Sequence, residues 1–223
     1  MEDERRNECL RVFHHELGHW FVAKQVGFEP QYIEVKSEWH SKWISSGSCS
    51  TVLYYKCKES DVADYLIKRQ LVLLAGAVFE AVKAKFGLDK AINNLQNNTA
   101  IDDNKKFMEL AMISLNLRLG EIEESVESLC QRINIHGSDD LYQELIMHRE
   151  RLAGIIYIIC DTKINDFLMQ SIAIFNRKLD EGSCKDIVTI PMDELEKVYF
   201  DTISGYLFPE EIIPFSNGVL RFL

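Results

Sequence analysis

The chain has 223 residues, 47% of them apolar, and a formal net charge of −10, a length that suits one compact core or two small domains. A surface this negative lacks the basic patch that neutralises phosphates, which argues against nucleic acid and anionic membranes as partners. The chain shows no secretory leader, no apolar run long enough for a membrane segment, and six scattered cysteines without a CxxC pair, so we predict a soluble cytoplasmic protein with reduced thiols.

The first part of the chain predicts one helix followed by two strands. Residues 4–26 carry apolar side chains every three or four positions, which indicates an amphipathic helix, and Gly27 is well placed to end it. Residues 31–35 and 50–57 favour β-structure. We therefore expect a small antiparallel pair with a long connection of about fourteen residues.

The rest of the chain predicts mostly helices. Residues 61–86 indicate a helix that is apolar on every side and therefore buried, and residues 87–98 indicate a polar, Asn-rich loop. Further helices are expected at residues 100–119, 121–135, 138–160 and 163–181, before a short strand-like run and a brief helix after Pro191.

These elements predict a mainly α fold with a small β-hairpin or sheet near the N-terminus. We interpret residues 1–223 as a single domain. Residues 1–120 would form its core, and residues 121–223 would supply additional helices that complete the core or form an interface.

The first predicted helix contains an HExxH motif. Because His15 and His19 are four positions apart, both imidazoles lie on one face of the helix and can reach one metal ion. Glu16 projects about 100° around the helix from His15, where a carboxylate can take a proton from metal-bound water, as in zinc peptidases. The alternative is an ordinary amphipathic helix with two histidines. Gly18 argues against it, because a mid-helix glycine costs about 1 kcal/mol relative to alanine unless another group approaches closely.

A catalytic zinc ion needs a third protein ligand and an open position for water. Three downstream carboxylates lie on predicted helices, those of Glu80, Asp102 and Asp103. Asp102 is better explained as a capping partner at the start of a helix. The spacing alone does not decide between Glu80 and Asp103.

Three segments resemble the peptidase domain of the FtsH family, zinc proteases fused to an AAA ATPase module. They are HHELGHWFVA at 14–23, LLAGAVFEAV at 73–82 and NTAIDDNKKFMELA at 98–111, in the family's order. The family's third zinc ligand is an aspartate that opens a later helix, a position that falls on Asp103. The resemblance spans residues 9–115 and implies one zinc ion per chain, held by His15, His19 and Asp103.

The chain also departs from this family. Ala77 stands where the family commonly has arginine, and Ala81 stands where it commonly has a second glutamate. No GxxxxGK[ST] motif occurs, so we expect a peptidase without its own ATPase module, acting on a polypeptide substrate alone or with a separate ATPase or protein partner. The oligomeric state stays open.

Two further roles are expected around this site. Zinc peptidases commonly hold substrate as an added strand along a sheet edge. The run at residues 50–56 would supply this edge, with Thr51, Val52, Leu53 and Tyr54 as the substrate-binding residues, or the earlier run at residues 33–35 would supply it. A hairpin that merely covers the core is the alternative. Glu80 would accept a hydrogen bond from a ligand histidine, with a structural ion pair as the alternative.

The sequence therefore predicts a zinc-dependent metalloendopeptidase in which Glu16 is the general base. The alternative function is a catalytically inactive, peptidase-like helical protein that acts as an adaptor or regulator of a larger protease.

Overall fold

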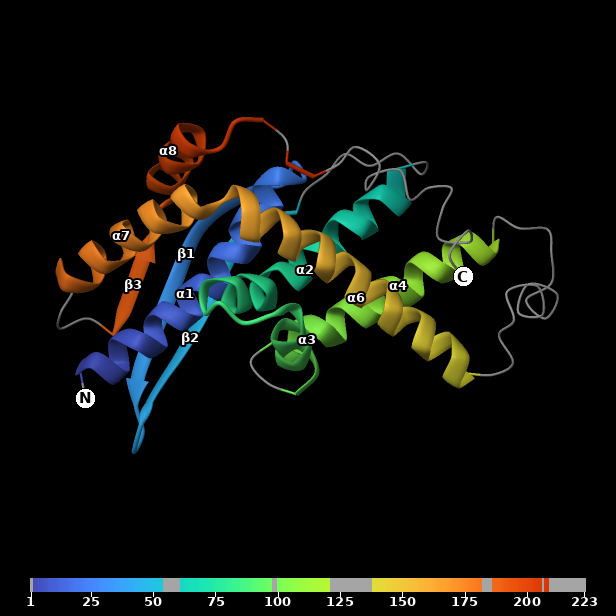
Figure 1. Cartoon of the computed structure of the whole chain (residues 1–223), viewed down its shortest axis with the longest axis horizontal. Coiled ribbons are helices and arrows are strands. Elements are labelled where there is room, and N and C mark those ends of the chain that lie inside the picture. Colours follow the sequence, from blue (N-terminus) through green and yellow to red (C-terminus); the bar gives the residue numbers. More distant parts are fainter. Residues whose placement is uncertain are drawn as a thin grey trace.

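The computed structural model describes residues 2–53, 61–97, 100–120, 138–181, 186–205 and 207–208 (Figure 1). Its elements in chain order are α1 (Glu2–Gln25), β1 (Glu29–Trp39), β2 (Trp43–Val52), α2 (Val62–Lys83), α3 (Leu88–Asn97), α4 (Ile101–Gly120), α6 (Ser138–Lys163), α7 (Asn165–Glu181), β3 (Ile187–Ile190) and α8 (Met192–Thr202). The predicted fold class, mainly helical with a small antiparallel sheet, is confirmed. Within these ranges, none of the helices combines the length and apolarity needed to cross a membrane.

The sheet has the strand order β2-β1-β3, and both pairs are antiparallel. The prediction of a long connection between the first two strands is wrong. The strands extend to Trp39 and Trp43, which pair directly, and only residues 40–42 join them. The polar, Ser-rich segment hid the start of β2, because this strand is largely exposed and has little apolar alternation. Since β2 lies at the edge of the sheet, its outer side is unpaired among the described residues.

The predicted Asn-rich loop is also wrong, because Leu88–Asn97 forms helix α3. Its buried side chains, Ala91, Asn94 and Leu95, recur at helical spacing. The asparagines between them obscured this pattern in the sequence. The helix expected at residues 121–135 lies outside the described residues.

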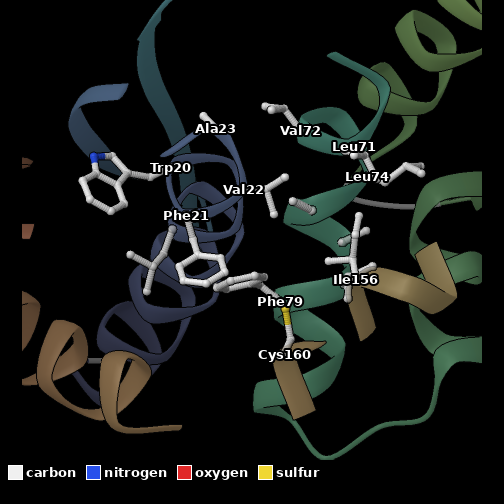
Figure 2. Packing of buried hydrophobic residues seen from close by; sticks show 14 of the residues in the cluster. Trp20, Phe21, Val22, Ala23, Leu71, Val72, Leu74, Phe79, Ile156 and Cys160 are labelled. Carbon is white, nitrogen blue, oxygen red and sulfur yellow. The ribbon is translucent and has the colours of Figure 1, made fainter. Parts of the chain in front are cut away.

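Helix α1 packs against α2, the two long strands and α7 (Figure 1). Phe21 of α1 and Phe79 of α2 meet at a ring distance of 5.6 Å, and Ile156 and Cys160 of α6 cover another side of α2 (Figure 2). The distant strand β3 joins the sheet beside β1. The later part of the chain therefore contributes to the same apolar core as α1 and α2.

Candidate metal centre

Helices α1 and α2 approach unusually closely where Gly18 faces α2. A Cβ atom built on Gly18 would lie 2.5 Å from the carbonyl oxygen of Ala75, closer than real Cβ atoms come. The glycine inside the HExxH motif is therefore required by packing, as its cost in a helix suggested. This contact fixes the side of α1 that carries the two histidines against α2.

His15, His19 and Asp103 come together in the structure. The Nε2 atom of His15 lies 3.0 Å from that of His19 and 3.0 Å from Oδ2 of Asp103. The distance from His19 Nε2 to the same oxygen is 3.3 Å. These three residues form a group able to hold a metal ion, with two ligands from α1 and one from the first turn of α4.

The outer nitrogen of each imidazole is held by an acceptor. His19 Nδ1 donates to the carbonyl oxygen of Val72 at 2.7 Å, and His15 Nδ1 donates to Oε1 of Glu80 at 3.0 Å. When the rings are neutral, as metal binding requires, each carries its proton on Nδ1 and points the lone pair of Nε2 at the other ring and at Asp103. Such outer partners orient the histidines of metal sites.

The donor atoms converge in a way that needs positive charge. Two nitrogen lone pairs and a carboxylate oxygen repel one another at 3.0–3.3 Å unless a proton or a cation lies between them. Although burial opposes a charged ring, hydrogen bonds to Asp103 and Glu80 raise the pKa of His15 to about 10. Burial would raise the pKa of Asp103, but the two histidines hold it well below its ordinary value. Ligands of a tetrahedral metal ion with bonds of about 2.0–2.2 Å lie about 3.3 Å apart, so the spacing fits one ion.

Gly76 of α2 keeps the space beside these nitrogens open. A Cβ atom there would lie 2.6 Å from His15 Nε2 and 2.7 Å from His19 Nε2. Any side chain at this position would displace the two imidazoles from their common point.

Glu80 is placed as predicted for an acceptor to a ligand histidine. The same oxygen that accepts from His15 also accepts from Arg11 at 3.2 Å, and its second oxygen accepts from Asn94 at 3.4 Å. Glu80 is 8% exposed. The ion pair and the histidine contact, weighed as alternatives in the sequence, are therefore both present.

Glu16 lies between α1 and strand β2. Its side chain is 8% exposed, and among the described residues no hydrogen bond or ion pair engages its carboxylate. A Cβ atom on Gly47 of β2 would lie 2.6 Å from Glu16 Cγ, so β2 passes directly over this side chain. In the described structure this carboxylate can therefore contact a group bound beside the candidate ligands.

A pocket of about 330 Å³ contains the three candidate ligands and Glu16. Thr51 and Leu53 line this pocket as well, whereas Val52 does not and is 39% exposed. Tyr54 lies outside the described residues. The edge strand β2 therefore lines the pocket together with residues of α1, α2 and α4.

Cys49 also lines the pocket, but it is poorly suited to act as a nucleophile. Burial raises the pKa of its thiol to about 12, so the thiol stays protonated near neutral pH. His14 faces away from the candidate ligands, into a different cavity beside Lys83. Burial lowers the pKa of His14 to about 4, helped by the charge of Lys83.

Sequence reasoning missed several contributors to the site. Gly47 was not singled out, although an isolated glycine in a strand often marks a close approach of another group. The carbonyl of Val72 carries no signal in a sequence, because its role comes from backbone geometry. Arg69 and Lys106, which also line the pocket, were not singled out, although Lys106 lies inside the segment at 98–111.

A scan of the chain against models of protein families and a search of curated proteins both found no match. The arguments for a function therefore come from the residues and their geometry.

Proposed function

We propose that the chain is a zinc-dependent metallopeptidase that hydrolyses peptide bonds, with a site of the FtsH-peptidase kind. The observation that carries the proposal is the convergence of three ligand atoms beside an unpaired, buried carboxylate. His15, His19 and Asp103 supply those atoms at separations of 3.0–3.3 Å, and Glu16 shares their pocket. This is the donor set and base that metal-assisted hydrolysis needs.

The donors favour zinc. Two imidazole nitrogens and one carboxylate oxygen suit Zn²⁺, and three protein ligands leave a fourth position open, as in catalytic rather than structural sites. A bound zinc ion would polarise the carbonyl of the scissile bond and acidify a water molecule.

The chain's own residues would perform the remaining tasks. Glu16 would accept the proton of the attacking water and then deliver it to the leaving amine. Its lack of a partner in the described structure leaves it ready for both steps. Glu80 and the Val72 carbonyl would keep the two imidazoles oriented throughout.

The substrate would bind along β2. This strand is at the edge of the sheet and forms a wall of the pocket from Gly47 to Leu53. An extended peptide could pair with its backbone and bring a carbonyl group to the metal ligands. The absence of a side chain at Gly47 supports this arrangement, because it lets the strand lie close to Glu16.

Metal content tests the ligand set first. Elemental analysis of the purified protein should give about one zinc per chain, and Asp103→Ala should lose most of it. Asp102→Ala is the matched control, since Asp102 is exposed and pairs only with Lys105 among the described residues. A chain that takes up no zinc when zinc is supplied, or equal metal in both variants, would refute the site.

Glu16→Gln tests the chemistry. This variant should keep its zinc but lose hydrolysis of an unfolded protein substrate, because an amide does not accept the proton. Equal activity in wild type and variant would remove Glu16 from the mechanism. Bound zinc without any peptidase activity in the wild type would favour the inactive adaptor instead.

A further inference from the structure

Two cations line the same pocket as the candidate metal ligands. Arg69 lies on α2, one turn before Val72, whose carbonyl holds His19. Lys106 lies on α4, one turn after Asp103. Both line the same pocket as the β2 residues Gly47 and Thr51, so a peptide paired with that strand would enter the pocket that they line.

Asp103 attracts Arg69 across the pocket, but neither cation has a close ionic partner in the described part of the chain. No hydrogen bond or ion pair engages Arg69 or Lys106 there, although Glu16 and Asp103 line the same pocket. Arg11, in contrast, contacts the carboxylates of Glu8 and Glu80 at 2.7 and 3.2 Å. In a chain with a net charge of −10, these two cations place positive charge beside the candidate ligands, with Lys106 exposed and Arg69 half-buried.

Arg69 is the more informative of the two. Its side chain is partly buried, and burial lowers the pKa of its guanidinium. Removing a cation from water without pairing it is unfavourable, whereas a charge-assisted hydrogen bond to a carboxylate offsets that loss. A guanidinium also presents a planar pair of donors that matches both oxygens of a carboxylate.

We infer that Arg69 and Lys106 form a carboxylate-binding subsite, so that the preferred substrates are peptides with a carboxylate close to the cleaved bond. This inference rests on the proposed peptidase function. The carboxylate would come either from an aspartate or glutamate side chain or from the C-terminus of the substrate. The first source makes the enzyme an endopeptidase with acidic specificity, and the second makes it a carboxypeptidase.

Peptide binding to zinc-loaded Glu16→Gln protein tests the subsite without relying on turnover. Four fluorescent hexapeptides of one sequence would differ in a central Glu or Gln and in a free or amidated C-terminus. We expect one carboxylate to tighten binding by about tenfold or more in fluorescence anisotropy, the effect of a hydrogen bond to a charged group. The peptide that gains affinity identifies which carboxylate is recognised.

Arg69→Gln and Lys106→Gln in the same background should each reduce this preference, and the double variant should abolish it. Lys105→Gln is the matched control, because it removes the same charge from the neighbouring position, where the lysine pairs with Asp102. It should leave the preference unchanged. Zinc content is measured for every variant, so that a lost ligand set is not mistaken for a lost subsite.

Equal affinity for all four peptides would overturn the inference, as would a preference that survives in the double variant. Failure of the proposed function gives a different result. In that case the wild type cleaves none of the peptides, while the carboxylate preference and its dependence on Arg69 persist in the binding assay.

Discussion

The two sides of helix α1 are built in opposite ways. Toward α7 and α8 it presents aromatic rings: Phe13 stacks on Phe175 at 4.3 Å, and Phe21 meets Phe167 at 5.1 Å. Toward α2 it presents Phe21, which meets Phe79, and next to it a glycine and two histidines, where the backbones come close enough to exclude a side chain at Gly18. The α7 side is filled with bulky apolar groups throughout, whereas part of the α2 side is kept clear for polar ones.

This difference separates stability from chemistry on a single helix. Aromatic rings bury large apolar areas, which suits a face that anchors the helix. The α2 side has to hold three ligand atoms at separations of 3.0–3.3 Å, which small shifts would spoil. We therefore expect substitutions on the two sides to affect different measurements.

Gly76→Ala should have the largest effect on metal binding. The added Cβ atom would lie 2.6 Å from His15 Nε2, so zinc affinity should fall by more than about 1,000-fold, or about 4 kcal/mol. Gly87→Ala is the control, because nothing lies within 4 Å of a Cβ atom there. Competition with a chelator measures both variants. Undiminished zinc affinity in Gly76→Ala would show that α1 and α2 can move apart to accept the added Cβ atom. The α2 side of α1 would then not be the side that small shifts spoil.

Phe167→Ala should affect stability instead. Phe167 is fully buried among Trp20, Phe21 and Tyr199, so its truncation should lower the free energy of unfolding by about 3–5 kcal/mol. The folded variant should still bind one zinc ion. Urea denaturation of the metal-free protein measures the change, with Phe200→Ala, 67% exposed, as the control. If Phe167→Ala is as stable as the wild type but binds no zinc, the aromatic side of α1 controls metal binding and the comparison is wrong.

His14 should make the metal-free protein less stable in mild acid. In the folded protein its pKa is lowered to about 4 by burial and by Lys83, whereas an unfolded histidine takes up a proton near its ordinary pKa of 6.5. The unfolded state therefore binds more protons in this window, and the free energy of unfolding should fall by up to about 3 kcal/mol as the pH drops from 6.5 to 4.

Denaturation of chelated wild type and His14→Leu across this range isolates the effect. The raised pKa of His15 does not contribute, because its stabilisation is fully present below pH 6.5 and is lost only as the pH rises through about 10. Parallel pH curves for the two proteins would show that His14 takes up no extra proton on unfolding.

Glu80→Gln should have the smallest effect, because the amide oxygen still accepts a hydrogen bond from His15 without the charge. We expect zinc affinity to fall by about 10–100-fold. Glu8→Gln is the control, since Glu8 shares the contact with Arg11 but touches no candidate ligand. Equal zinc affinity in the two variants would mean that Glu80 contributes only its ion pair with Arg11 and does not support His15 as a ligand.

Much of the fold and the candidate triad could be predicted, because helical spacing is a local property of the sequence. His15 and His19 share a face for that reason, and Asp103 was assigned by resemblance. What could not be predicted depends on contacts between distant segments. Gly47 matters only because β2 crosses Glu16. Helix α3 was missed because its few apolar side chains form a buried face only when they pack against the rest of the core.

The division of the triad between α1 and α4 has a consequence for the life of the protein. A metal ion held by His15, His19 and Asp103 would be a reversible cross-link between segments that are far apart in the sequence, closing a long loop of chain. Since binding to the folded state alone shifts the folding equilibrium, resistance to heat and to proteolysis should follow the concentration of free metal. A cell short of that metal would then lose the protein itself as well as its activity.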